Sequence, residues 1–348
     1  MTRVRTLIVD DSASMRAALN RILTADPEIE VVGMAPEPHA ARAMIKELNP
    51  DVITLDVEMP GMDGLSFLEK IMRLRPMPVV MCSTLTARGA DVTIEALRLG
   101  AVDCIAKPSG NALELAREAE NLCEVVKTAG RASVRAKSMS APAGAAGPAP
   151  SAGPLRDVVI AIGASTGGVE ALFTVLSGLP VDCPPVLVVQ HMPADFTGRF
   201  AARLDRDCAV RVVEATDGCP VARGTVYIAP GGANHMELAG GVGGRIKLRR
   251  GDLVTGHRPS VDVLFRSVAA VGSKAVGAIL TGMGSDGAEG LLAMRTAGAR
   301  TFGQNQESCV VYGMPRAAFA LGAVERETSV SAMAEAILGV CRNQNSGA

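Results

Sequence analysis

Short apolar runs alternate with stretches of helical period along the first 125 residues of the chain. The five runs are TLIVD, VVGMA, VITLD, PVVMC and DCIAK. Strand-length apolar runs that alternate with amphipathic segments are typical of βαβ units and a parallel sheet. The pattern therefore predicts a doubly wound (βα)5 domain.

The remaining apolar runs lie between residues 158 and 280, and helical-period segments separate several of them. They are VVIAI, VLVVQ, VRVVEA, TVYIA, IKLR and VGAIL. Between residues 225 and 249, hairpin-like turns join the runs and leave no room for helices, which favours a local antiparallel excursion. We therefore expect an α/β protein with two doubly wound parallel-sheet domains and a small antiparallel excursion in the second.

A low-complexity segment separates the two patterns. Residues 138–154, SMSAPAGAAGPAPSAGP, contain only small residues, proline and one methionine. Such a segment buries too little apolar area to offset the entropy of ordering it, so it is expected to be a flexible linker. The predicted organisation is a first domain at 1–125, a linker at 126–155 and a second domain at 156–348.

Charge and cysteine usage narrow the class of protein. Lys and Arg number 35 against 36 Asp and Glu, and this balance gives no reason to expect nucleic-acid binding or membrane insertion. The first residues lack the apolar core of a signal peptide, and no apolar run approaches a bilayer span. The eight cysteines show no C-x-x-C spacing, which suits thiols in a reducing compartment. We expect a cytoplasmic protein.

In the first domain, polar and charged side chains stand where the strand runs end. They are Asp10 and Asp11 after the first run, Asp56 after the third, Ser83 and Thr84 after the fourth, and Lys107 after the fifth. The carboxyl ends of parallel strands line one crevice, so these groups can converge. Three carboxylates in one pocket repel one another, and a hard cation such as Mg²⁺ would lower that cost. A carboxylate beside Mg²⁺, a lysine and a hydroxyl is suited to accept a phosphoryl group.

This ordered set of strand-end residues resembles the response-regulator receiver domain over residues 3–125. The resemblance implies that Asp56 is the phosphoacceptor, with Asp10 and Asp11 as metal-binding acids. It further implies Ser83, or the adjacent Thr84, as the switch hydroxyl and Lys107 as the cation that pairs with the phosphate. The backbone carbonyl of Glu58 would complete the metal ligands, and a cis bond could precede Pro108.

One position departs from the receiver pattern. Receivers commonly carry an aromatic switch residue three positions before the lysine, and this chain has Cys104 there. A toggling aromatic side chain is therefore in doubt. Switching is expected to run mainly through the loop after Ser83.

The second domain begins with a glycine-rich corner, GASTGG at 163–168, that allows two interpretations. A phosphate-binding dinucleotide loop needs G-x-G-x-x-G, but Ser165 stands where the second glycine would be, and no P-loop motif occurs. The corner does fit G-x-S-x-G between a strand and a helix, the context of a nucleophile elbow. On its own, however, a serine in a tight glycine turn is more often a helix cap.

A serine nucleophile needs a base, and four histidines are candidates. His191 directly follows the run VLVVQ, whereas His235 and His257 lie in turns and loops and His39 lies in the first domain. Strand-end placement favours His191, with His235 and His257 as structural or substrate-facing residues. Asp286 follows the run VGAIL at a helix entrance, where it can orient the histidine, cap the helix, or do both.

The corner GASTGG together with QHMP and TGMGSDG, behind a receiver and a linker, resembles the CheB-type chemotaxis protein-glutamate methylesterases. HRPSVDVLF (257–265) and CVVYGMPRAA (309–318) extend the likeness across nearly the whole chain. The resemblance implies hydrolysis of glutamyl methyl esters on methyl-accepting chemoreceptors, with deamidation of certain receptor glutamines. It also implies that the chemotaxis histidine kinase is the phosphodonor of the receiver. The unphosphorylated receiver would then cover the catalytic face of the second domain.

By this interpretation Ser165 attacks the ester, His191 takes its proton and Asp286 orients the imidazole. Backbone amides at Thr166 and Met283 are candidate oxyanion donors, and the step needs no metal or organic cofactor.

Three competing hypotheses remain. A DNA-binding regulator lacks a basic recognition helix beyond RIKLRR, an NAD-binding enzyme is disfavoured by Ser165, and a non-catalytic interaction module would release no methanol.

Overall fold

The computed structural model describes residues 2–59, 64–83, 87–107, 112–132, 134 and 155–342. Thr84, Pro108 and most of the expected linker lie outside the described residues. The chain divides into two compact units, 1–140 and 141–348.

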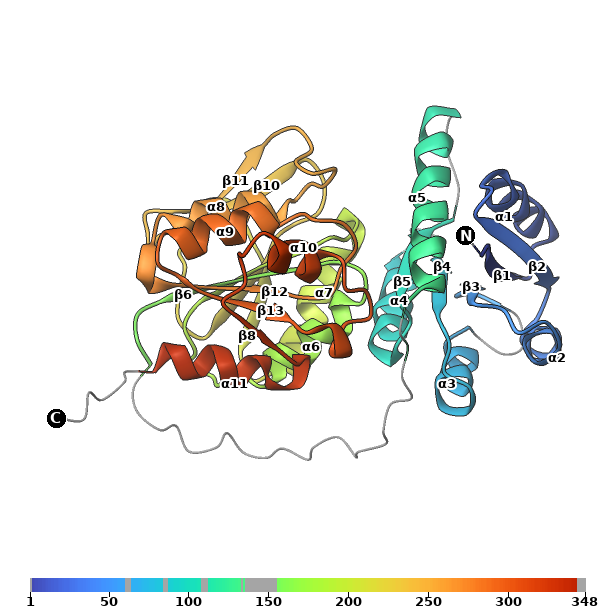
Figure 1. Ribbon diagram of the computed structural model, residues 1–348, viewed down its shortest axis with the longest axis horizontal. Helices are drawn as coiled ribbons and strands as arrows, with labels where there is room; N and C mark the ends of the chain where they lie inside the picture. Colours follow the sequence, from blue (N-terminus) through green and yellow to red (C-terminus); the bar gives the residue numbers. More distant parts are fainter. Residues whose placement is uncertain are drawn as a thin grey trace. The chain divides into compact units, whose positions relative to one another are not determined.

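The first unit is a five-stranded sheet in the order β2-β1-β3-β4-β5, and every neighbouring pair of strands is parallel (Figure 1). Helices α1 and α5 pack against each other, and so do α3 and α4. The elements are β1 Val4–Val9, α1 Ala13–Ala25, β2 Ile29–Ala35, α2 Pro38–Leu48, β3 Val52–Asp56, α3 Gly64–Leu74, β4 Val79–Ser83, α4 Ala87–Leu99, β5 Asp103–Ala106 and α5 Ala112–Gly130. The (βα)5 prediction is confirmed.

Helix α5 continues past residue 126, where the sequence predicted the linker to begin. Its last two turns carry Val125, Val126 and Ala129, all of them buried. Lys127 on the same helix forms ion pairs with Asp26 at 3.1 Å and with Glu28 at 3.3 Å, beyond the end of α1. Apolar burial and these ion pairs keep the segment helical to Gly130.

The second unit holds a seven-stranded sheet in the order β14-β13-β12-β6-β7-β9-β8, again with every described pair parallel. Helices α8 and α9 cover one face and α6 and α11 the other (Figure 1). Its strands are β6 Val159–Ala164, β7 Val186–Gln190, β8 Arg211–Glu214, β9 Thr225–Ile228, β12 Ala275–Ile279, β13 Arg300–Gln304 and β14 Arg326–Thr328. Its helices are α6 Gly168–Ser177, α7 Ala194–Asp207, α8 Val261–Ala269, α9 Ala288–Thr296, α10 Met314–Ala320 and α11 Val330–Cys341.

An antiparallel hairpin, β10 Asn234–Ala239 with β11 Arg245–Arg250, stands apart from this sheet. The expected antiparallel excursion is therefore confirmed, although the run TVYIA forms β9 inside the parallel sheet. The inward side chains Met236, Leu238 and Ile246 join the same core as α8. The hairpin and α8 thus form one packed layer beside the sheet.

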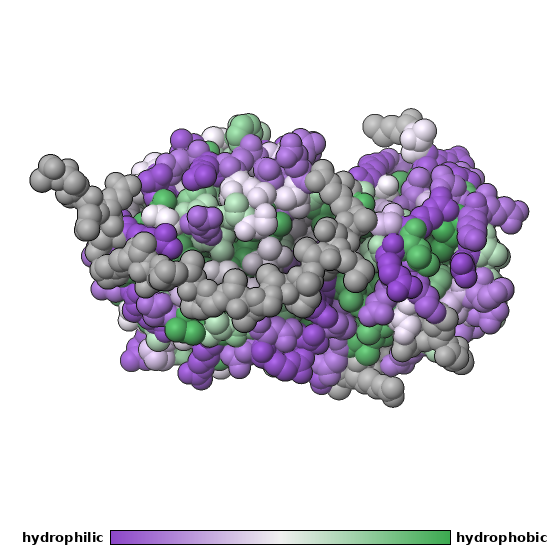
Figure 2. Space-filling model, turned by 90° about the horizontal axis from the view of Figure 1, so that it is seen from below, coloured by the Kyte–Doolittle hydropathy of each residue, from purple (hydrophilic) through white to green (hydrophobic). Residues whose placement is uncertain are grey.

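The cores of both units consist almost wholly of aliphatic side chains. The chain has 7 Phe, 2 Tyr and no Trp, and the central strands β3, β4, β6, β7 and β12 are buried at every position. Strands buried on both faces are characteristic of parallel sheets covered by helices. On the face shown in Figure 2, hydrophilic side chains cover most of the surface, with small apolar areas between them.

Strand order also locates the crevice in which a site is expected. From β6 the chain passes through α6 to β7 on one side, whereas β12 lies on the other side of β6. In open α/β sheets, ligands bind outside the carboxyl ends of the strands where the strand order reverses. Ser165 follows β6, His191 follows β7 and Asp286 lies in the loop after β12.

Candidate active site

The corner after β6 is held by backbone contacts that depend on its glycines. The Ser165 amide donates to the Thr281 carbonyl at 3.0 Å, and the Ser165 carbonyl accepts from the Gly168 amide at 2.7 Å. Gly167 has φ of 75°, in the left-handed region. A Cβ on Gly282 would lie 2.7 Å from the Ser165 Cβ. The two glycine-rich loops therefore meet at the serine side chain.

His191 and Asp286 are hydrogen-bonded to each other. The His191 Nε2 lies 2.8 Å from the Asp286 Oδ2, and both side chains are almost fully buried. An ionised carboxylate only accepts, so Nε2 carries the proton and Nδ1 keeps its lone pair. The Nδ1 is buried and has no hydrogen-bond partner among the described residues. The imidazole is thus set up as a base at Nδ1.

Asp286 is held by the N-terminus of α8. Its Oδ2 accepts from the Val261 amide at 2.8 Å, and its Oδ1 accepts from the Ser260 hydroxyl at 2.7 Å and the Asp262 amide at 3.1 Å. Burial alone would raise the pKa of this carboxyl, but the bonds from His191, Ser260 and Val261 outweigh it and lower the pKa. Asp286 therefore stays ionised beside the histidine.

The position of Asp286 refines the capping hypothesis. Gly287, not Asp286, is the N-cap of the following helix α9. The carboxylate instead binds the first amides of α8, where the helix dipole favours negative charge. Asp286 lies 24 to 26 residues from these partners in the sequence, so a local sequence pattern does not predict the contact.

Gln190, which sequence reasoning left out, and His235, which it treated as structural or substrate-facing, support the site. Gln190 donates from its Nε2 to the carbonyls of Ser165 at 2.9 Å and His191 at 3.1 Å. The buried His235 accepts the Ser260 amide at its Nδ1 (3.2 Å), while its Nε2 donates to the Asp252 carbonyl at 2.8 Å. A polar residue at the end of an apolar strand run was the available signal for Gln190.

The two other histidines of this unit differ in role. His235 is structural, because both of its ring nitrogens bond to backbone groups. His257 lies with its ring stacked on that of His191, with centroids 3.7 Å apart and planes at 8°. Ser165 is partly exposed, and the His191 amide donates to the carbonyl of its neighbour Ala164 at 3.1 Å.

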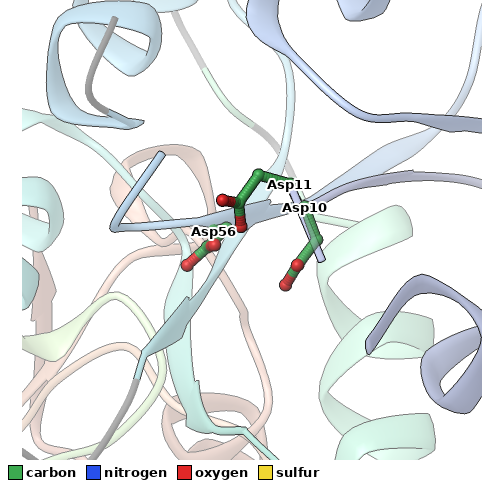
Figure 3. Close-up of side chains that lie close together, drawn as sticks. All are labelled: Asp10, Asp11 and Asp56. Atoms are coloured by element: carbon green, nitrogen blue, oxygen red, sulfur yellow. The ribbon is translucent and has the colours of Figure 1, made fainter. Parts of the chain in front are cut away.

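The first unit carries a second site, at the carboxyl ends of β1 and β3. Carboxylate oxygens of Asp10, Asp11 and Asp56 lie within 4.8 Å of one another (Figure 3). The Lys107 Nζ forms ion pairs with the Asp10 Oδ2 at 2.9 Å and the Asp56 Oδ2 at 2.8 Å. Three carboxylates against one ammonium leave an excess of negative charge, and oxygen donors of this kind are what Mg²⁺ prefers. The residues present fit a divalent cation.

Burial shapes the charges of this cluster. It raises the pKa of Asp56, although the hydrogen bond and charge of Lys107 and the Glu58 amide act in the opposite direction. Burial also disfavours the charged form of Lys107, but its bonds to Asp56 and Asp10 outweigh this and raise the lysine pKa.

The Lys107 amide donates to the Ser83 carbonyl at 2.9 Å, so Ser83 ends its strand beside the lysine. Cys104 lies on β5 and replaces the aromatic residue of the receiver pattern.

Among the described residues, no helix is long and apolar enough to cross a membrane.

Comparison with known proteins assigns a family to each part of the chain. A model for the CheB methylesterase family matches residues 160–337, and one for the response regulator receiver domain matches residues 6–118. The protein-glutamate methylesterase/protein-glutamine glutaminase 1 of Caulobacter vibrioides is 58% identical over 342 residues, which cover 97% of this chain and 98% of the relative. The corresponding protein of Agrobacterium fabrum is 53% identical over 350 residues, covering 99% and 98%.

A solved structure supports the fold of the second unit. The Thermotoga maritima CheB methylesterase catalytic domain is 35% identical, with a TM-score of 0.51, and the match covers 53% of this chain and 98% of that domain.

Proposed function

Since the chain belongs to the CheB-type protein-glutamate methylesterase/protein-glutamine glutaminase family, we propose that Ser165, His191 and Asp286 carry out its hydrolytic reaction. The enzyme serves chemotactic adaptation and is regulated by its receiver domain. The observation that carries the residue assignment is the hydrogen bond between His191 and Asp286 beside the Ser165 corner. It leaves a buried, unpartnered Nδ1 to act as the base.

The proposed reaction proceeds in two halves. The Ser165 Oγ attacks the ester carbonyl of a methylated glutamate while the His191 Nδ1 takes the hydroxyl proton. The tetrahedral intermediate collapses, methanol leaves with that proton, and an acyl-serine remains. Water then loses a proton to the same Nδ1, attacks the acyl carbon, and the serine oxygen recovers the proton as glutamate departs. With a glutamine substrate the leaving group is ammonia.

Asp286 supports both halves through its charge. Its ionised carboxylate keeps the proton of His191 on Nε2 and stabilises the imidazolium that forms in each half. We propose the backbone amides at Thr166 and Met283 as oxyanion donors, because these residues follow Ser165 and Gly282, which lie in contact. The esterase step itself calls for no metal or organic cofactor.

For the receiver we propose Asp56 as phosphoacceptor, with Mg²⁺ held by the carboxylates of Asp10, Asp11 and Asp56 and by the Glu58 carbonyl. When bound, Mg²⁺ would neutralise charge on the oxygens of the incoming phosphoryl group. Lys107 already bridges Asp10 and Asp56 and would pair with the phosphate. Ser83, or the adjacent Thr84, is the proposed switch hydroxyl.

Partners, location and boundaries follow as further proposals. Methyl-accepting chemoreceptors are the proposed substrates, and the chemotaxis histidine kinase is the proposed phosphodonor. All eight cysteines are free thiols, which supports a reducing, cytoplasmic location. We propose that the receiver ends with α5 at Gly130 and that the catalytic domain begins near residue 156.

The proposal is tested by the release of methanol from membranes that carry methylated chemoreceptors. The wild-type chain is expected to release methanol faster when a small acyl phosphate and Mg²⁺ are present. Asp56→Asn, which removes the phosphoacceptor oxygen, is expected to lose this stimulation. Asp51→Asn changes an exposed aspartate at the start of β3 and serves as the matched control. Stimulation that survives in Asp56→Asn would move the phosphoacceptor to another residue.

Deletion of residues 1–140 is expected to raise the esterase activity above that of the intact, unphosphorylated chain. The reason is that the family resemblance implies inhibition by the unphosphorylated receiver. Each tenfold difference in activity corresponds to about 1.4 kcal/mol of inhibitory free energy. Methanol release from the two forms at equal concentration measures the difference. A truncated enzyme that is slower than the intact chain would contradict inhibition by occlusion.

A further inference from the structure

The ring of His257 covers one face of the proposed catalytic base. The imidazoles of His257 and His191 are nearly parallel, with an interplanar angle of 8° and centroids 3.7 Å apart. Among the described residues, the hydrogen bonds of the His191 ring are limited to one edge, where Nε2 bonds to Asp286. A ring fixed at a single edge can still tilt about that hydrogen bond, whereas a second ring against its face restricts the tilt.

The backbone before His257 is fixed by a tight turn. Val254 and His257 exchange two amide-to-carbonyl hydrogen bonds, of 3.1 and 2.9 Å. The two residues between them, Thr255 and Gly256, have φ of 52° and 81°. A β-branched residue rarely adopts a left-handed conformation, and such strain persists where the surrounding structure holds it, often at functional sites. Here the Thr255 hydroxyl donates to Asp262 at 3.4 Å.

The backbone after His257 is anchored as well. The Arg258 guanidinium donates to the carbonyls of Gly232 at 2.8 Å and Gly251 at 2.6 Å. Two residues further, the buried Ser260 caps the N-terminus of α8 and donates to Asp286. The loop that carries His257 is therefore tied to the hairpin on one side and to the Asp286 cradle on the other.

The charge state of His257 suits a ring that faces a developing cation. Burial and, to a smaller extent, the charge of His191 together lower its pKa to about 4, although Asp286 acts in the opposite direction. His257 is therefore neutral near pH 7. A neutral aromatic ring can face an imidazolium, whereas a second imidazolium there would repel it. The charged guanidinium of Arg258 is hydrogen-bonded to two backbone carbonyls of neighbouring loops.

We propose that His257 is a positioning residue for ester hydrolysis, whose stacked ring holds the plane of His191 and so fixes the direction of the Nδ1 lone pair. The inference rests on the proposed function, in which Nδ1 moves a proton in both halves of the reaction. His257 acts on the base and not on the substrate. Its loss therefore changes kcat with little change in KM.

The test compares His257→Ala with His257→Phe in the full-length chain, by methanol release from methylated receptor membranes. His257→Ala is expected to lower kcat by about 10- to 100-fold, the cost of a small misplacement of a catalytic group, with KM within about twofold. Phenylalanine keeps a flat, neutral aromatic ring at the stacked position. His257→Phe is expected to restore kcat to within about threefold of wild type. His39→Ala removes an exposed histidine of α2 and is the matched control.

Thermal melting of both variants separates positioning from unfolding. A wild-type kcat in folded His257→Ala would overturn the proposal, and so would a folded His257→Phe as slow as His257→Ala. Should the alanine variant fail to fold, the kcat of His257→Phe decides alone. Ser165→Ala separates the two hypotheses: full activity there refutes the proposed function, whereas an inactive Ser165→Ala beside a fully active His257→Ala refutes only the stacking role.

Discussion

Replacing Ser165 by alanine is expected to lower kcat for methanol release by on the order of 10⁴-fold or more. The substitution removes the only oxygen that the proposed mechanism acylates, while it leaves the corner itself in place. The Ser165 backbone bonds to Thr281 and Gly168 do not involve the side chain, so the variant is expected to fold normally. Residual activity would come from the oxyanion donors and from substrate binding.

The measurement is the rate of methanol release from methylated receptor membranes, with thermal melting as the check on folding. Ser331→Ala changes an exposed serine on α11 and is the matched control. A second readout is covalent labelling by a serine-directed reagent, which is expected in wild type and absent from Ser165→Ala. A variant that keeps more than about one hundredth of the wild-type rate would exclude Ser165 as the nucleophile.

The positions of the three proposed catalytic residues follow from rules that act on sequence alone. Ser165, His191 and Asp286 each follow an apolar strand run, and parallel strands bring their carboxyl ends to one edge of the sheet. The order of strands places β6 between β7 and β12, so the three loops are neighbours. The bond between His191 and Asp286 is the consequence of that arrangement. In the receiver, the same rule brings Lys107 to Asp10 and Asp56.

The surroundings of the proposed catalytic residues could not be predicted from the same pattern. Ser260 and His257 belong to the loop before α8, and no strand run ends beside them in the sequence. Their contacts with Asp286 and His191 depend on how α8 and the hairpin pack over the sheet. Three strands have no apolar run of their own for a related reason: β10 contains Asn, His and Glu, β13 contains Arg, Gly and Gln, and β14 has three residues. None of them forms a long apolar run, and tertiary pairing makes them strands.

Replacing Asp286 by asparagine is expected to lower kcat by about 10³- to 10⁴-fold and to destabilise the fold as well. The carboxylate faces donors only: the Ser260 hydroxyl, the amides of Val261 and Asp262, and the His191 Nε2. An asparagine must turn its NH₂ group toward one side of this set. If the amide nitrogen takes the place of Oδ2, it donates to Nε2 and moves the imidazole proton to Nδ1, where it blocks the base.

If the amide nitrogen takes the place of Oδ1 instead, the Asp262 amide loses its acceptor and Ser260 must turn its hydroxyl proton away. Each buried donor left without a partner costs about 1–3 kcal/mol. The variant is therefore expected to have a lower free energy of unfolding, measured by urea denaturation, together with its loss of kcat.

The lowered pKa of Asp286 predicts a related pH effect. The ionised carboxylate stabilises the fold above the pKa that Asp286 has in the unfolded chain, and this stabilisation is lost as pH falls through its pKa in the folded chain. Wild type is expected to lose stability more steeply than Asp286→Asn on acidification. Equal acid sensitivity of the two proteins, or a wild-type kcat in the variant, would show that this carboxylate does not hold His191.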